Sequence, residues 1–304
     1  ALAAGGAGLS TGLVYAPAMH ARPEEIQALA RVVARRGGIY ATHMRSEGGA
    51  LLEAIEEALD VARAAGVRLQ ISHLKTAGRA NWHKLDAALE KIRAARQAGI
   101  AVASDRYPYT ASCTDLDVIL PAWAAQGGRA AILARLRNPA ERAQIRAELA
   151  AARDDKYWEA VWVGSTRHPD NAPFTGRPIL KAAEAWKLHP LDAALRFMEK
   201  DELFTGGIFF GMNEENMRRI LAEPWVMIGS DASIRAPWGP LSHDHPHPRA
   251  YGTFGRFMRS VLDGQGVAVG EAVRKMTSLP AEHFRLKDRG VIRKGAFADI
   301  VVLD

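Results

Sequence analysis

Two histidines and two aspartates come at the ends of short apolar runs, and these residue types can bind metal ions or move protons. His43 closes the run IYATH, His73 closes LQISH, Asp231 closes VMIGSD, and Asp105 follows IAVAS. A single histidine at such a place is often structural, with its ring hydrogen-bonded to the backbone. Two imidazoles and a carboxylate at equivalent places are harder to explain by packing. They suit a divalent ion, with zinc as the first candidate.

The elements that must position these side chains follow a repeated pattern. An Ala- and Arg-rich stretch with apolar residues at i, i+3 and i+4 leads through a glycine into a short apolar run. It does so three times, with helical stretches at 23–36, 50–65 and 82–98. The pattern predicts amphipathic helices that end at a left-handed glycine, and buried parallel strands joined by right-handed crossovers. Because the carboxyl ends of parallel strands meet at one edge, the polar residues should share that edge.

The repeat is interrupted after Tyr109, which predicts an inserted subdomain. The stretch that follows is rich in helical patterns, and the βα pattern returns only with NEENMRRILAE and the run WVMIGSDAS. The predicted units are βα units over 1–111, a helix-rich insertion and return over 112–224, a last strand with its loop and helices over 225–288, and a closing segment over 289–304.

Composition excludes several classes of protein. The 304 residues include 40 Lys and Arg against 34 Asp and Glu, a formal charge of +6, and 48% are hydrophobic, which excludes global disorder. The positive residues are spread along helical stretches, so no nucleic-acid partner is expected. No apolar stretch reaches about 18 residues, so no membrane span is expected. Cys113 is the single cysteine, which predicts no internal disulfide and a cytoplasmic location.

Several motifs together resemble the N-acyl-D-amino-acid deacylases, or D-aminoacylases, of the amidohydrolase superfamily. They are THMRSE, ISHLK, DRYPYTAS, GSDAS and HPRAYGTF, with GLSTGLVYAP near the start and the closing stretch 275–304. The last fifteen residues are similar to amidohydrolases in general, whereas the combination of ISHLK with DxYPY and HPRxYGTF is much more specific for the deacylases. The resemblance covers nearly the whole chain and is weakest in the insertion.

The resemblance implies a fold and a reaction. The α/β fold would be a partial (β/α)₈ TIM-type barrel containing strands four to eight, with an inserted subdomain and, at 289–304, the start of a C-terminal β-sandwich segment. The reaction would be zinc-dependent hydrolysis of the amide of an N-acyl-D-amino acid to a carboxylate and a free D-amino acid. His43 and His73 would bind Zn²⁺. Asp231 would take a proton from the attacking water and give it to the departing amine.

The same resemblance implies how the small-molecule substrate is held. Lys75, Tyr109 and Arg249 match positions that hold the substrate carboxylate, and Tyr15 matches another pocket residue. Arg can bind a carboxylate with two parallel hydrogen bonds. From the residues alone, Lys75 could be a surface lysine, although we favour a site role, and the two tyrosines could equally be rim aromatics. We expect Asp105 to cap the turn that follows it.

The chain also departs from the family pattern. Family members begin with an HxH pair on the first barrel strand and supply a cysteine metal ligand from the second, and neither precedes Gly5. Cys113 follows the YPY motif and is not that ligand. We therefore expect a truncated form of a longer protein. The stretch from His243 to His247 contains two overlapping HxH patterns, but the neighbouring prolines predict a rim loop there rather than a metal site.

Three alternatives stay open at this point. The first is a cyclic-amide hydrolase of the dihydroorotase or hydantoinase kind, although the stretch GLSTGLVYAP lacks the lysine that such enzymes usually carboxylate. The second is a catalytically silent truncated chain. The third is a basic binding module, which should carry no stoichiometric zinc. The sequence does not indicate oligomeric state or acyl and side-chain specificity.

Overall fold

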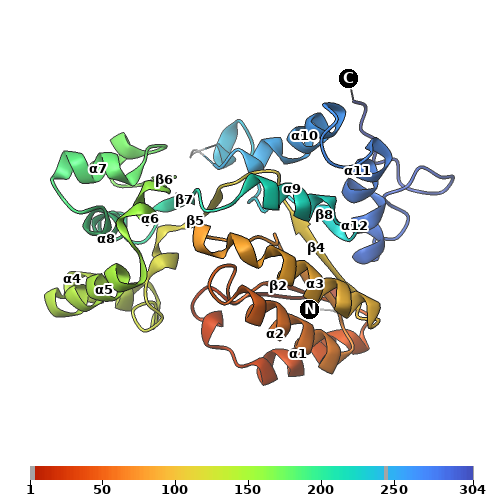
Figure 1. The fold of residues 1–304 in the computed structure, drawn as a ribbon, viewed down its shortest axis with the longest axis horizontal. Coiled ribbons are helices and arrows are strands. Elements are labelled where there is room, and N and C mark those ends of the chain that lie inside the picture. Colours follow the sequence, from red (N-terminus) through yellow and green to blue (C-terminus); the bar gives the residue numbers. More distant parts are fainter. Residues whose placement is uncertain (1–3, 243–245, 304) are drawn as a thin grey trace.

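The chain forms two regions, a larger one around a parallel sheet and a smaller helix-rich one (Figure 1). The computed structural model describes residues 4–242 and 246–303. We call residues 112–209 the inserted lobe, and the described residues before and after it the sheet region. The chain enters the inserted lobe after one strand of the parallel sheet and comes back before the next strand, so the lobe interrupts a single βα series.

The sheet of the sheet region has five parallel strands in the order β1-β2-β3-β4-β8. Their bounds are β1 Gly8–Gly12, β2 Ile39–His43, β3 Arg68–Ile71, β4 Val102–Arg106 and β8 Val226–Ile228. These strands include the apolar runs that the sequence predicts to end in polar residues. The first four are consecutive in the sequence, as the βα repeat predicts, whereas β8 pairs with β4 only after the inserted lobe.

Three helices pack on one face of this sheet, and they coincide with the predicted amphipathic stretches. They are α1 Pro23–Arg35, α2 Leu51–Ala65 and α3 Leu85–Gln97. Proline at the first position of α1 and Gly66 in the left-handed region after α2 (φ 64°) mark helix ends, as expected for these residues. Buried side chains such as Ile55, Leu69 and Ile92 form the core between helices and sheet.

The inserted lobe has a core and a sheet of its own. Its strands are β5 Ser112–Asp115, β6 Val161–Val163 and β7 Gly206–Phe209, in the antiparallel order β5-β7-β6. Its helices are α4 Gly128–Arg137, α5 Pro139–Ala152, α6 Asp155–Glu159, α7 Ile179–Trp186 and α8 Pro190–Lys200. The sequence predicts the helices but not this sheet, because its strands have only three or four residues and too little periodicity.

Four helices complete the sheet region beyond the inserted lobe. They are α9 Glu214–Ala222, α10 Arg249–Leu262, α11 Val269–Met276 and α12 Ser278–His283. Within residues 4–242 and 246–303, short 3₁₀ helices occur at Ala18–His20, Arg79–Lys84, Leu116–Ile119, Ala172–Phe174 and Gly239–Leu241. Met217, Ile228 and Phe257 belong to the small apolar core that joins α9 and α10 to β8.

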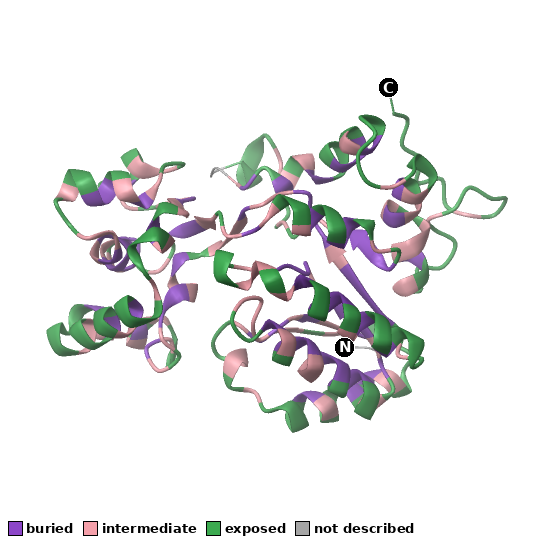
Figure 2. Ribbon diagram, viewed as in Figure 1, coloured by how far each residue is buried: buried purple, intermediate pink, exposed green. Residues whose placement is uncertain are grey.

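The closing segment 289–303 contains no strand, and it includes an exposed loop that projects from the rest of the molecule (Figure 2). The sequence predicts the start of a β-sandwich segment there. Ile292 and Val302 are about nine-tenths exposed, at 92% and 90%. A sandwich strand needs a partner strand to satisfy its backbone, and none of the described residues pairs with this segment. Among the described residues, no helix has the length and apolar character needed to cross a membrane.

Candidate metal centre and substrate pocket

The structure brings His43, His73 and Asp231 together at the carboxyl edge of the parallel sheet. His43 is the last residue of β2, His73 follows the end of β3 by two residues, and Asp231 follows the end of β8 by three. The two imidazole centroids are 4.4 Å apart, and His73 Nε2 lies 4.0 Å from Asp231 Oδ1. This is the arrangement that the polar strand ends predict.

The backbone at two of these residues is in an unusual conformation. His73 has φ 39° and Asp231 has φ 49°, which places both in the left-handed region. For a residue with a side chain this conformation costs about 1 to 3 kcal/mol, and such outliers cluster at functional sites. Each residue lies in the turn just after its strand. The turns therefore direct both side chains toward the same space instead of continuing the strands.

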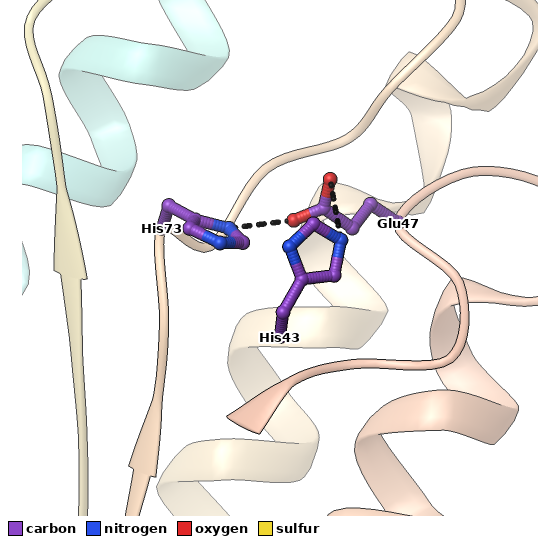
Figure 3. Close-up of side chains that lie close together, drawn as sticks. All are labelled: His43, Glu47 and His73. Atoms are coloured by element: carbon purple, nitrogen blue, oxygen red, sulfur yellow. Dashed lines mark hydrogen bonds and ion pairs between the residues drawn. The ribbon is translucent and has the colours of Figure 1, made fainter. Parts of the chain in front are cut away.

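Glu47, which is not among the residues predicted from the sequence, lies between the two histidines and contacts both (Figure 3). Its Oε1 is 2.7 Å from His73 Nδ1 and 2.5 Å from Lys75 Nζ, and its Oε2 is 3.8 Å from His43 Nε2. One potential ligand atom from each of His43, Glu47 and His73 lies within 4.8 Å of the others. The sequence signal was a carboxylate four residues after His43 within the motif THMRSE.

Burial and charge leave these groups in forms that can bind a cation. Burial lowers the pKa of His43 to about 4, so its imidazole is neutral at pH 7. Burial alone would raise the pKa of Glu47, but Lys75 and His73 outweigh it and hold that pKa well below its usual value. Neutral imidazole and ionised carboxylate are the ligand forms that divalent metals require. The donor set therefore fits a divalent metal of the zinc type.

Asp105 supports His73 from the neighbouring strand instead of capping the turn after its own strand. Its Oδ1 accepts a hydrogen bond from the backbone N–H of His73 at 2.9 Å, and its Oδ2 accepts one from Gln70 Nε2 at 2.6 Å. Burial raises the pKa of Asp105. The expected turn cap is thus replaced by a bond across strands, because β3 and β4 are hydrogen-bonded neighbours.

Arg249 and Lys75 bring positive charge to the same site. Arg249 Nη1 donates to Asp231 Oδ2 at 2.6 Å, and Nη2 donates to the carbonyl of Cys113 at 2.9 Å. Lys75 is only 3% exposed, which excludes an ordinary surface lysine. An open cleft of about 520 Å³ adjoins Asp231, lined by Cys113, Thr114, Asp115, Ser230, Asp231, Ala232, Ser233 and Arg249. The inserted lobe therefore supplies one wall through β5.

The tyrosines differ in how close they come to the metal-binding cluster. The ring of Tyr15 lies 5.0 Å from that of His43, and burial raises the pKa of Tyr15 to about 12. Tyr109 lies farther out, with its hydroxyl donating to the carbonyl of Pro248 at 3.4 Å. Tyr107 is not among the predicted site residues, yet it is fully buried, and the guanidinium of Arg249 lies 4.8 Å from its ring centroid. The YPY motif thus places Tyr107, rather than Tyr109, beneath Arg249.

Only the end of the predicted rim loop can be located, because residues 243–245 lie outside the described residues. His247 is 6% exposed, and its ring lies 5.3 Å from that of Tyr109. Its Nδ1 accepts a hydrogen bond from the backbone N–H of Arg249 at 3.0 Å. His247 therefore supports the start of α10, where Arg249 is the first residue.

Comparison with known proteins gives one family and a consistent group of relatives. A family model described as the amidohydrolase family matches residues 4–304. Two proteins of Alcaligenes xylosoxydans xylosoxydans are similar over the whole chain, an N-acyl-D-glutamate deacylase at 37% identity and a D-aminoacylase at 36%. The chain spans 53% of the length of each of these relatives.

Solved structures agree with the sequence comparison. An N-acyl-D-glutamate deacylase of Bordetella bronchiseptica, complexed with zinc and a phosphonate mimic of the tetrahedral intermediate, matches with a TM-score of 0.76 and 31% identity. The match covers 97% of this chain and 52% of that one. A D-aminoacylase structure matches with a TM-score of 0.75 and 32% identity, over 98% of this chain and 53% of that one.

Proposed function

Because the chain belongs to the amidohydrolase family, we propose that its site hydrolyses the amide of N-acyl-D-amino acids, giving a carboxylate and a free D-amino acid. The observation that carries this proposal is the meeting of His43, His73 and Asp231 at one sheet edge, with His73 Nε2 4.0 Å from Asp231 Oδ1. The matching relatives are an N-acyl-D-glutamate deacylase, a D-aminoacylase and an N-acyl-D-aspartate deacylase, which supports a linear amide over a cyclic one.

The resident metal in this proposal is zinc, held by His43 and His73. A divalent cation at these residues would supply polarisation of the amide carbonyl and a lower pKa for an attacking water. The related structures with zinc or a binuclear metal centre support this choice. The five parallel strands would be strands four to eight of a (β/α)₈ barrel. The cytoplasm stays a prediction that rests on the single cysteine.

Each of the remaining polar residues has a proposed task. Asp231 would accept a proton from the attacking water at a carboxylate oxygen and return it to the departing amine. Arg249 and Lys75 would bind the substrate carboxylate, and since Arg249 already contacts Asp231, that carboxylate would lie beside the proton carrier. Tyr15 would line the pocket next to His43, and Tyr109 would help to hold the carboxylate.

The test uses the protein expressed with whatever natural sequence flanks these residues. Release of free amino acid is measured with N-acetyl-D-glutamate, N-acetyl-D-aspartate and N-acetyl-D-leucine and with their L-enantiomers, alongside zinc content. We expect release from D-substrates only, and we expect Asp231→Asn to lower kcat by about 10²- to 10⁴-fold with zinc still bound. Zinc-loaded protein that releases no D-amino acid would contradict the proposal, and a near-normal Asp231→Asn rate would remove Asp231 from its role.

A further inference from the structure

We propose that Glu47 is a positioning residue that decides which nitrogen of His73 carries the proton, and so whether His73 can bind a metal through the nitrogen that faces Asp231. The inference deepens the proposed function, since it concerns the same metal site. A Glu47 oxygen lies close enough to both rings to be a third ligand, but the role inferred for Glu47 is on the histidines themselves. Its carboxylate acts on the outer side of the two imidazoles, away from Asp231.

The contacts of Glu47 divide each imidazole into an outer and an inner side. Glu47 reaches His73 at Nδ1 and His43 at Nε2, at 2.7 and 3.8 Å (Figure 3). The opposite nitrogen of His73, Nε2, is the one that lies 4.0 Å from Asp231 Oδ1. A separation of 4.0 Å is too long for a hydrogen bond, so Asp231 does not hold a proton on that nitrogen.

Lys75 makes the protonation of His73 a choice between two arrangements. Lys75 Nζ lies 2.7 Å from His73 Nδ1 and 2.5 Å from Glu47 Oε1, so these three atoms are mutually in contact. An ammonium group only donates, and a neutral imidazole nitrogen either donates or accepts. Either His73 Nδ1–H and Lys75 both donate to Glu47, or Lys75 donates to a bare Nδ1. The second arrangement puts the proton on Nε2, where it blocks a metal.

An ionised carboxylate favours the first arrangement. One Glu47 oxygen can accept from both donors, and bonds to a charged acceptor are roughly twice as strong as neutral ones. A hydrogen bond to the outer nitrogen of a ligating histidine also fixes the ring orientation. Without Glu47, Lys75 would be left with His73 Nδ1 as its close acceptor. Glu47 thus keeps His73 competent for metal while it holds Lys75, the proposed carboxylate-binding residue, in place.

The loop that carries Glu47 is held on several sides, as a positioning role requires. The backbone carbonyl of Glu47 accepts a hydrogen bond from the N–H of Ala77 at 2.7 Å. Arg45 binds both carboxylate oxygens of Glu57 at 2.9 and 2.7 Å, and it also donates to the carbonyls of Met19 and Ala21. These bonds tie both sides of the loop to the sheet region. The carboxylate is therefore preorganised before any ligand binds.

The experiment compares Glu47→Ala, Glu47→Gln, Lys75→Met and the double variant Glu47→Ala/Lys75→Met, with Glu56→Gln as a matched control. Glu56 is a carboxylate on α2 whose ion-pair partners are Lys91 at 2.7 Å and Arg63 at 3.8 Å, and neither of these partners is a residue of the site. Two readouts need no substrate. The His73 tautomer is read from ¹⁵N shifts of metal-free protein, and the zinc Kd is read by competition with a chelator. Failure of deacylase activity would leave both readouts intact.

We expect Glu47→Ala to move the His73 proton from Nδ1 to Nε2 and to weaken zinc binding by about 10- to 100-fold. Glu47→Gln keeps an oxygen that accepts from Nδ1–H, so it should keep the tautomer and lose less affinity. Lys75→Met should restore more affinity in the Glu47→Ala background than it adds to the parent, because it removes the competing donor. Glu56→Gln should change neither readout.

Two outcomes would overturn the inference. The first is an unchanged His73 tautomer in Glu47→Ala. The second is an equal loss of zinc affinity in Glu47→Gln and Glu47→Ala with strictly additive effects of Lys75→Met, which would assign Glu47 as a direct ligand or a simple charge.

Discussion

The carboxyl edge of the parallel sheet and the core of the inserted lobe bury different kinds of side chain. At the carboxyl edge of the sheet region, His73, Lys75 and Arg249 are each less than 9% exposed and contact other polar groups. The core of the inserted lobe is built from aliphatic and aromatic residues, among them Trp158 and Phe197. The difference indicates a division between a region that carries the chemistry and a region that mainly supports the fold. Buried polar groups in the sheet region set geometry for chemistry, whereas burial in the inserted lobe mainly supplies stability.

The largest effect that tests this division should come from His73→Ala. His73 contacts Glu47 and Lys75 and faces Asp231, so its removal should abolish stoichiometric zinc binding and lower kcat/KM by about 10³-fold or more. The free energy of unfolding should change much less than zinc binding and kcat/KM, because the inserted lobe and the helical core do not contain this side chain. Zinc content, deacylase rate and the urea midpoint are measured together. Full zinc content in the variant would refute the assignment of His73.

The opposite outcome is expected for Phe197→Ala in the inserted lobe. Phe197 is fully buried, with ring centroids 4.9 Å from Trp186 and 6.1 Å from Phe174. Truncation to alanine should lower the free energy of unfolding by about 3 to 5 kcal/mol. Zinc affinity in the absence of denaturant should stay within about twofold of the parent. A parallel loss of zinc affinity would mean that the inserted lobe holds the metal site, and the division would fail.

The sequence predicts the site residues that lie at strand ends better than those that lie in irregular loops. The ends of parallel strands are fixed by topology, so His43, His73 and Asp231 could be predicted to meet from their places after apolar runs. The family match confirms the resemblance on which their roles rest, while the roles themselves stay predictions. The motif THMRSE places the carboxylate of Glu47 four residues after His43, but Glu47 lies in an irregular loop, so no periodicity fixes the direction of its side chain.

Two further differences between prediction and structure have physical reasons. Tyr107 and Tyr109 are two residues apart beyond the end of β4, where the strand alternation no longer applies, so the sequence could not decide which one contacts Arg249. In the inserted lobe, β5 pairs with β7 across more than ninety residues of chain, as Ser112 lies opposite Phe209. Such a pairing depends on tertiary packing and leaves little local signal in strands of four residues.

A smaller effect should appear in the folding stability of the sheet region when the pH is lowered. Burial, with Arg68 nearby, lowers the pKa of His283 at the end of α12 to about 4, against about 6.5 in an unfolded chain. Above pH 6.5 both states are neutral. As the pH falls from 6.5 toward 4, the unfolded state takes up the proton first, so the folded state loses stability.

The measurement is the free energy of unfolding of metal-free protein at pH 7 and pH 5, for the parent and His283→Leu. The parent should lose about 1 kcal/mol more than the variant between these pH values, a figure reduced for partial solvent screening. The other titrating groups are common to both proteins and cancel in the difference. Equal losses in the two proteins would show that His283 is not protected from protonation in the folded state.

The smallest effect should come at the bridge between the two regions, where the hydroxyls of Tyr15 and Thr114 are 3.0 Å apart. If the Tyr15 hydroxyl serves only this bridge, Tyr15→Phe and Thr114→Val should each change KM by less than about fivefold, the value of one exposed hydrogen bond, and their effects should not add. If the hydroxyl also binds substrate, Tyr15→Phe should raise KM well beyond Thr114→Val. The proposed pocket role of Tyr15 requires contact with substrate. Equal and non-additive effects would therefore show that its hydroxyl has only a structural role, and Arg249 and Lys75 would remain as the carboxylate-binding pair.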